Sequence, residues 1–164
     1  MSNRRLAARV IARLRDGGLR LVTAESLTGG LIGATLTAVP GSSEAYRYGF
    51  VAYSPEAKGE MLGVDPADIE RYGIVSGEVA SAMAAGALKA GHGEVSIAVT
   101  GVAGPGGGTE AVPVGTVWMA CAKRGGGGTP AILTRRVSLR GSRDRIRRLT
   151  VTRALGLVLE HLDS

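Results

Sequence analysis

The chain has 164 residues, of which 45% are hydrophobic, 21% charged and 4% aromatic, and its formal net charge is +6. This is the composition of one globular domain, and no apolar run approaches the roughly 18 residues of a membrane span. The single cysteine, Cys121, excludes an intrachain disulfide, and the N-terminus lacks the apolar core of a signal peptide. We therefore expect a cytoplasmic protein in which Cys121 is a small hydrophobic residue of a strand.

The first third of the chain alternates helical and extended patterns. Apolar residues at intervals of four predict a helix over residues 3–16, followed by a short strand over 19–22. A helix over about 31–39 and a second strand over 49–53 come next. The Ser-Pro-Glu sequence after the second strand is typical of a helix start, with serine as N-cap and proline at the first helical position.

The rest of the chain continues the alternation. It predicts a short helix from Pro66, a helix over 77–90, strands over 95–100, 116–122 and 131–137, and a final helix from Ser142. Four glycines at 125–128 indicate a hairpin, and therefore at least one antiparallel pair. These elements predict an α/β fold: a three-layer α/β/α sandwich with a mixed, mostly parallel five-stranded sheet, in one domain over residues 1–164.

The segment 23–30 (TAESLTGG) joins the first strand to the following helix. A helix start of this kind leaves backbone N–H groups unpaired and attracts negative charge. Ser26 can cap the helix, hold a substrate or attack one. Glu25 is either a surface acid or a carboxylate that orients a substrate.

Polar residues follow the ends of three predicted strands: Ser26 and Thr28 the first, Tyr53 and Lys58 the second, and Thr100 with Gly101 the third. Open α/β sheets bind ligands just beyond the carboxyl ends of their strands. We therefore expect these residues to meet at one site.

Lys58 decides what such a site can do. With the ordinary pKa of about 10.4, roughly one lysine in 2,500 is neutral at pH 7, which makes it useless as a base. Burial, or a place near the positive end of a helix, lowers the pKa. Lys58 is thus either a buried base or a surface lysine at the end of a short helix, and Tyr53 either a rim aromatic or a residue that orients Lys58 or relays a proton.

Several kinds of site are disfavoured. His92 and His161 have no acidic or thiol neighbours at ligand spacing, so we expect neither a metal site nor a Ser-His-Asp triad. The glycine loop over 101–108 lacks the Gly-Lys-Ser/Thr of a P-loop and a clean dinucleotide fingerprint. Kinase and dehydrogenase chemistry, and with them a nucleotide cofactor, are therefore not expected.

The basic residues concentrate near the C-terminus: Arg135, Arg136, Arg140, Arg143, Arg145, Arg147, Arg148 and Arg153. Most are expected to form a solvated helix face. Nucleic-acid binding ranks last among the functions considered, because there are few aromatic residues for base stacking. One or two of these arginines would suffice to hold an anionic small molecule.

Six motifs in order resemble the CinA C-terminal domain family from about residue 3 to the end: TAESLTGG, GSS at 41–43, FVAYSPEAK at 50–58, GIVS at 73–76, TGVAGPGGG at 100–108 and PVGTVW at 113–118. Members include nicotinamide mononucleotide amidase, which forms nicotinate mononucleotide and ammonia. The resemblance implies a cytoplasmic, metal-independent serine amidohydrolase without cofactor, active as a homodimer or larger homo-oligomer. Some members carry an upstream domain, and this chain is expected to act without one.

The resemblance implies that Ser26 is the nucleophile, Lys58 its base and Tyr53 an assistant, with Thr100 in the site and Arg143 on the substrate phosphate. The oxyanion donors would be backbone N–H groups of Thr28, Gly29 and Gly30, or of Gly101. Glu25 and Ser43 are further candidates for substrate contact, and Ser42 and Ser43 are rival hydroxyls.

Two positions depart from the family pattern. Leu27 stands where a cysteine is common, which leaves the serine assignment intact, and Ser142 replaces the aspartate of a Gly-Asp-Arg motif, which affects the anion site. Two alternatives to the amidase remain: a non-catalytic relative that binds pyridine nucleotides, and a nucleic-acid-binding protein.

Overall fold

Five strands form a single sheet in a computed structural model that describes residues 1–164. The strands are β1 (Leu21–Glu25), β2 (Tyr46–Val51), β3 (Val95–Gly101), β4 (Thr116–Lys123) and β5 (Ala131–Ser138). The helices are α1 (Asn3–Asp16), α2 (Leu31–Thr37), α3 (Pro55–Leu62), α4 (Pro66–Tyr72), α5 (Gly77–Ala90) and α6 (Arg143–Asp163), with one 3-10 turn, η1 (Ser42–Glu44).

The sheet is mixed, with strand order β2-β1-β3-β4-β5. β1 pairs in parallel with both β2 and β3, whereas β4 pairs antiparallel with β3 and β5 antiparallel with β4. All strands except β4 therefore point the same way. This topology brings the carboxyl ends of β1, β2 and β3 to one edge of the sheet, as the sequence predicts.

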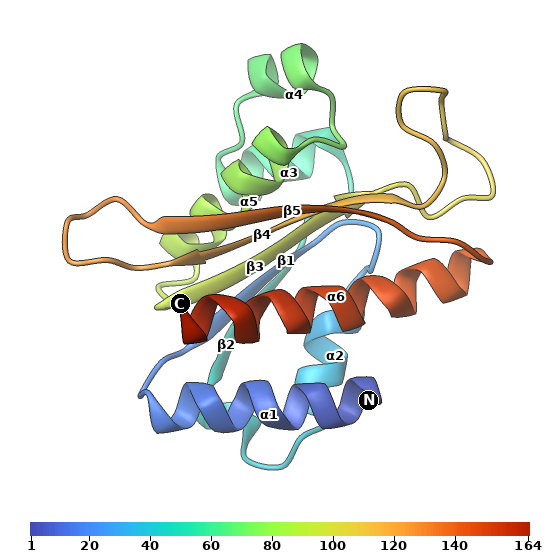
Figure 1. The fold of residues 1–164 in the computed structure, drawn as a ribbon. Coiled ribbons are helices and arrows are strands. Elements are labelled where there is room, and N and C mark those ends of the chain that lie inside the picture. Colours follow the sequence, from blue (N-terminus) through green and yellow to red (C-terminus); the bar gives the residue numbers. More distant parts are fainter.

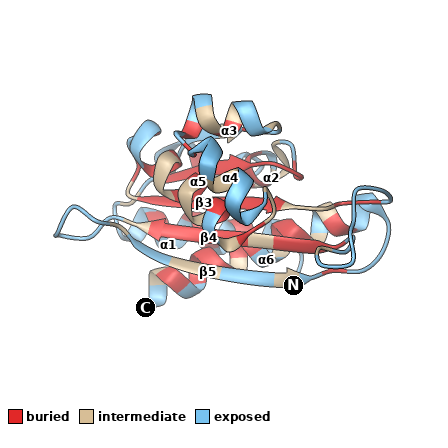
Figure 2. Ribbon diagram, turned by 90° about the horizontal axis from the view of Figure 1, so that it is seen from above, coloured by how far each residue is buried: buried red, intermediate tan, exposed pale blue.

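Helices cover both faces of the sheet, which confirms the predicted three layers. Figure 1 shows α1, α2 and α6 below the sheet and α3, α4 and α5 above it. Successive strand residues serve opposite faces: Ile97 belongs to the core under α1 and α6, and its neighbour Ala98 to the core under α5. Both cores are closed to water along β3 and β4, while β5 forms a more exposed edge (Figure 2).

Close packing of α3 on α5 depends on one glycine. A Cβ added at Gly86 of α5 would lie 1.8 Å from the carbonyl oxygen of Leu62 at the end of α3. No side chain fits in that space, so the two helices touch through their backbones. The contact holds α3, and with it Lys58, at a fixed height above the sheet.

The first two strands differ from their predicted bounds. β1 begins two residues later than predicted and continues through Thr23 and Glu25, whose polar side chains are fully or almost fully buried. A buried strand tolerates them because each has a partner: Thr23 Oγ1 lies 2.8 Å from the hydroxyl of Tyr46, and the carboxylate of Glu25 accepts two backbone N–H groups. β2 begins three residues earlier than predicted, and the β1–β2 register shifts near its start.

The last helix, α6, is the longest, with 21 residues. The hydroxyl of Ser142 caps it by accepting the N–H of Arg145, which confirms the predicted start. Its first turns carry Arg143 and Arg147 toward the carboxyl edge of the sheet. None of the six helices combines the length and the apolar composition needed to cross a membrane.

Candidate active site

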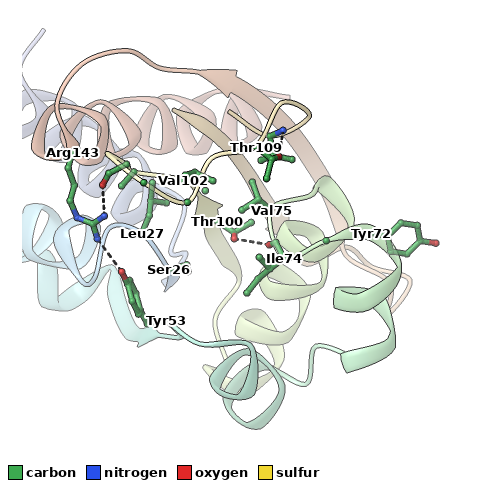
Figure 3. A pocket seen from close by; sticks show the side chains of 17 residues that line it. Ser26, Leu27, Tyr53, Tyr72, Ile74, Val75, Thr100, Val102, Thr109 and Arg143 are labelled. Atoms are coloured by element: carbon green, nitrogen blue, oxygen red, sulfur yellow. Dashed lines mark hydrogen bonds between the residues drawn. The ribbon is translucent and has the colours of Figure 1, made fainter. Parts of the chain in front are cut away.

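A pocket of about 500 Å³ opens at the carboxyl edge of the sheet, within the roughly 300–1,000 Å³ usual for small-molecule sites. Its wall is built from five separate segments of the chain. They are the turn after β1, the loop after β2, the α4–α5 connection, the glycine loop after β3 and the start of α6. Figure 3 shows Ser26, Tyr53, Ile74, Thr100 and Arg143 around this space.

Ser26 and Lys58 are in direct contact behind the pocket. Lys58 Nζ lies 2.9 Å from Ser26 Oγ and donates a second hydrogen bond of 2.9 Å to the carbonyl of Ala52. Lys58 exposes no surface at all, whereas Ser26 keeps 8% of its surface exposed and lines the pocket. The surface-lysine interpretation of Lys58 is therefore wrong.

The helix start predicted from the Ser-Pro-Glu sequence positions the lysine. Ser54 Oγ accepts the N–H of Ala57 at 3.0 Å, and Pro55 occupies the first helical position. Lys58 then falls in the first turn of α3 and points back toward the sheet edge. Its side chain reaches the end of β1 because β2, which leads into α3, lies beside β1 in parallel.

Burial lowers the pKa of Lys58 from 10.5 to about 8, because the charged ammonium loses its hydration. No carboxylate forms an ion pair with this lysine. At a pKa near 8, roughly one side chain in ten is neutral at pH 7, compared with one in several thousand at the ordinary value. The amine is thus able to accept a proton at physiological pH.

The turn that carries Ser26 does not use that serine as a helix cap. Helix α2 begins at Leu31 after Gly30, whose φ of 102° places it in the left-handed region, and Gly30 makes no side-chain cap bond. The carboxylate of Glu25 instead accepts the N–H groups of Ile32 at 2.8 Å and Gly33 at 3.0 Å. The hydroxyl of Ser26 is therefore left free to face Lys58 and the pocket.

Glu25 is only 1% exposed, so the surface-acid interpretation is wrong. The prediction that it contacts substrate is also wrong, because both carboxylate oxygens face the start of α2 and Glu25 does not line the pocket. Thr28, Gly29 and Gly30 follow Ser26 in the turn but do not line the pocket, whereas Ser26 and Leu27 do.

Tyr53 and Arg143 form one wall of the pocket. The Arg143 guanidinium donates to the hydroxyl of Tyr53 at 3.2 Å and to the carbonyl of Gly104 at 2.7 Å (Figure 3). Tyr53 is 60% exposed and makes no hydrogen bond to Lys58 or Ser26, so the prediction that it orients the lysine is wrong. Arg143 is the one charged residue that lines the pocket, which gives this wall a positive charge.

Thr100 and Gly101 lie at the end of β3, as predicted. Thr100 Oγ1 donates to the carbonyl of Ile74 at 2.9 Å and ties the strand to the α4–α5 connection. A Cβ at Gly101 would lie 2.7 Å from the carbonyl oxygen of Thr116, so the close approach of β3 and β4 requires glycine here. Both residues line the pocket.

Ser43 lies at the opposite edge of the sheet, and the prediction that it belongs to the site is wrong. It is part of η1, which leads into the amino end of β2, and the carbonyl of nearby Ala45 accepts the N–H of Leu21 at the start of β1. Ser26 follows the far end of the same five-residue strand, about 16 Å away at 3.3 Å per residue. Ser42 shares the position of Ser43 and is excluded with it.

Arg147 belongs to the site region, although the sequence alone does not single it out as a site residue. Its guanidinium donates to the carbonyls of Leu27 and Thr28, each at 3.0 Å, and so binds the turn that carries Ser26. Only its position one helical turn after Arg143 separates it from the other C-terminal arginines in the sequence.

Other reactive groups lie outside the pocket. Cys121 is a buried strand residue, as predicted, and burial raises the pKa of its thiol to about 12. No group of three or more histidine, cysteine, aspartate or glutamate side chains is arranged to hold a metal ion. The site's chemistry therefore centres on the Ser26 hydroxyl and the Lys58 amine.

Residues 3–162 match the family model of the CinA C-terminal domain. Among curated relatives, a CinA-like protein of Mycolicibacterium paratuberculosis is 50% identical over 153 residues, which is 93% of this chain and 34% of that protein. A CinA-like protein of Akkermansia muciniphila is 52% identical over 117 residues, or 71% and 28% of the two chains. The chain thus spans about a third of the length of these relatives.

Solved structures agree over nearly the whole chain. The competence/damage inducible protein CihA from Agrobacterium tumefaciens is 40% identical with a TM-score of 0.92, covering 99% of this chain and 96% of that one. The competence damage-inducible protein A (ComA) from Klebsiella pneumoniae is 34% identical with a TM-score of 0.93, covering 99% and 98%. The resemblance read from the motifs is confirmed by this agreement: the chain belongs to the CinA C-terminal domain family.

Proposed function

We propose that this protein is an amidohydrolase that uses Ser26 and Lys58 to hydrolyse the carboxamide of nicotinamide mononucleotide to nicotinate mononucleotide and ammonia. The observation that carries the proposal is the 2.9 Å contact between Ser26 Oγ and the amine of a completely buried lysine. Attack on an amide needs an activated hydroxyl and a proton donor for the departing nitrogen. One lysine with a pKa near 8 can serve as both.

In the proposed reaction, neutral Lys58 takes the hydroxyl proton of Ser26 as Oγ attacks the carboxamide carbon. The tetrahedral intermediate collapses when the resulting ammonium returns that proton to the nitrogen, and ammonia leaves. Water then attacks the acyl-enzyme ester, with Lys58 again accepting a proton and passing it back to Ser26 Oγ. The sum is amide plus water giving carboxylic acid plus ammonia, with no metal or cofactor required.

Backbone N–H groups of the Ser26 turn are the proposed oxyanion donors. The N–H of Ser26 itself donates to Val99 at 3.2 Å and that of Gly29 donates to Ser26 at 3.1 Å, so neither is available. Those of Leu27, Thr28 and Gly30 have no hydrogen-bond partner within the protein. A donor held ready in this way favours the transition state, because no reorganisation is needed as the negative charge develops.

The proposed binding mode assigns the substrate phosphate to Arg143 and the pyridine ring to the apolar part of the pocket. Eight of the 17 lining residues are hydrophobic, including Leu27, Ile74 and Val102, and no acidic residue lines the pocket. A guanidinium on a wall free of carboxylates attracts a phosphate. Homo-oligomeric assembly stays a prediction.

The test is ammonia release from nicotinamide mononucleotide by the purified protein, with nicotinate mononucleotide identified by chromatography. Ser26→Ala should lose at least about 10³-fold in kcat, while Ser43→Ala, a serine at the opposite edge of the sheet, should keep wild-type activity. Full activity in Ser26→Ala would exclude the mechanism. Tight binding of the nucleotide by the wild type with no ammonia formed would instead identify a non-catalytic pyridine-nucleotide-binding relative.

A further inference from the structure

Arg147 connects the last helix of the chain to the turn that carries Ser26. Its half-buried guanidinium donates through Nε to the carbonyl of Leu27 and through Nη2 to the carbonyl of Thr28, each at 3.0 Å. A Cβ at Gly29 would lie 3.7 Å from the same guanidinium, so the group lies against the turn's backbone. A planar fork that bonds two successive carbonyls fixes the orientation of both peptide groups.

These bonds also decide where the N–H groups of the turn point. A trans peptide is planar with its C=O and N–H on opposite sides, so holding the Leu27 carbonyl turns the Thr28 N–H away from Arg147. In the same way, holding the Thr28 carbonyl supports the Gly29 N–H, which donates to the carbonyl of Ser26 at 3.1 Å. Arg147 thus fixes the Leu27–Thr28 and Thr28–Gly29 peptide planes.

No other side chain performs this task. Within residues 27–30, the hydrogen bonds from Arg147 are the only ones that a side chain makes to the backbone. Thr28 is fully buried, and its own hydroxyl has no hydrogen-bond partner. Glu25 anchors the next segment through Ile32 and Gly33 but does not reach this stretch.

We propose that Arg147 is a positioning residue: it holds the Leu27 and Thr28 peptides, and with them the free N–H groups of the turn, in the orientation that stabilises the oxyanion formed when Ser26 attacks. The inference rests on the proposed function only in requiring that Ser26 attacks an acyl carbon. Arg147 does not touch the substrate in this scheme. It acts through the backbone of the turn.

The expected signature of Arg147→Ala is a loss in kcat without a matching rise in KM. An oxyanion donor contributes in the transition state more than in the ground state, and its loss costs about 10²–10³-fold in kcat. KM should stay within about twofold of the wild type, because Arg143 and the apolar wall are intact. Arg148→Ala is the matched control, since that neighbouring side chain is 65% exposed and pairs only with Asp144.

Chemical rescue distinguishes positioning from a general loss of structure. Guanidinium chloride at tens of millimolar should raise the kcat of Arg147→Ala at least tenfold. Sodium chloride or urea at the same concentration should not raise it. If Arg147→Ala does not fold, Arg147→Lys takes its place. A lysine can bond only one carbonyl at a time, so the kcat of this variant should lie between that of the wild type and a complete loss of activity. Wild-type kcat in the variant that folds, or equal rescue by all three additives, overturns the proposal.

A substrate-independent measurement separates this inference from the proposed function. A fluorophosphonate probe reacts with an activated serine, and the label on Ser26 is located by mass spectrometry of the intact and digested protein. Slower labelling of Arg147→Ala than of wild type and Arg148→Ala, by about the factor seen in kcat, supports positioning, and equal rates overturn it. If nicotinamide mononucleotide is not hydrolysed but wild-type Ser26 is labelled rapidly, the substrate assignment fails while the test of Arg147 still stands.

Discussion

The amine of Lys58 donates to the main-chain carbonyl of Ala52 at 2.9 Å, and this bond determines how the lysine faces Ser26. A neutral amine has one lone pair, and an N–H committed to the carbonyl helps to turn that lone pair toward the hydroxyl 2.9 Å away. Ala52 directly follows β2, and its own N–H donates to the carbonyl of Glu25. The Lys58 amine is therefore anchored to the strand edge that carries the Ser26 hydroxyl.

The activity should rise with pH as Lys58 loses its proton. Because burial lowers its pKa to about 8, kcat/KM for nicotinamide mononucleotide should increase about tenfold per pH unit below that value and level off above it. Initial rates between pH 6 and 9 measure the profile. A profile that is flat across pH 8, or that falls, contradicts Lys58 as the base, and Lys58→Arg, which cannot deprotonate, should be inactive throughout.

The same group should make stability depend on pH. Unfolded Lys58 has its ordinary pKa of 10.5, so between pH 8 and 10.5 the unfolded state binds more protons than the folded state, and wild-type stability rises with pH. Lys58→Met removes this contribution. The unfolding free energy of the wild type minus that of Lys58→Met should increase by up to about 3 kcal/mol across that pH window. Urea unfolding at pH 7, 8, 9 and 10 tests it, and a constant difference would show that the amine is not desolvated.

Arg143→Gln should weaken the binding of substrates that carry a phosphate and should leave the binding of other substrates unchanged. A charge-assisted contact contributes about 1.5–3 kcal/mol, so KM for the mononucleotide should rise about 10–100-fold, while the rate with nicotinamide riboside should barely change. Tyr53→Phe should have a smaller effect in the same direction, because Tyr53 only braces the guanidinium. Equal losses with both substrates in Arg143→Gln would place the phosphate elsewhere.

Alanine substitutions at two helix glycines should change the stability of the protein in opposite directions. Gly86→Ala puts a methyl group into the backbone of Leu62, so it should destabilise the protein by at least about 1–3 kcal/mol and lower kcat by displacing α3 with Lys58. At Gly156 in α6 nothing lies within 4 Å of the added carbon, so Gly156→Ala should stabilise by about 0.5–1 kcal/mol with unchanged kcat. Thermal melts and steady-state kinetics on both variants compare them, and a tolerated Gly86→Ala would show that α3 is free to move.

The fold was largely predictable because its signals are local. Caps at Ser54, Ser76 and Ser142 and the glycines of the hairpin place most elements to within a few residues. The start of β2 was missed because its residues resemble a loop: Arg47 and Tyr48 are exposed, and the partner strand β1, which includes Thr23, is distant in sequence.

The candidate site was predictable only where strand direction decides the outcome. Ser26 and Lys58 both follow strands that end at the same edge, so their meeting follows from the parallel pairing. Ser43 was misplaced because it precedes its strand instead of following it. The partners of Glu25, Tyr53 and Arg147 depend on side-chain directions that only the packed structure fixes.

The order in which the site's parts are synthesised follows from the position of α6. Ser26 and Lys58 are translated early, but Arg143 and Arg147 emerge about 90 residues after the lysine, which takes roughly 4–18 s at 5–20 residues per second. On the ribosome, the nascent chain therefore holds Ser26 and Lys58 for seconds before the proposed anion-binding residue Arg143 and the positioning residue Arg147 exist. We expect activity to switch on late in synthesis, once the final helix has docked.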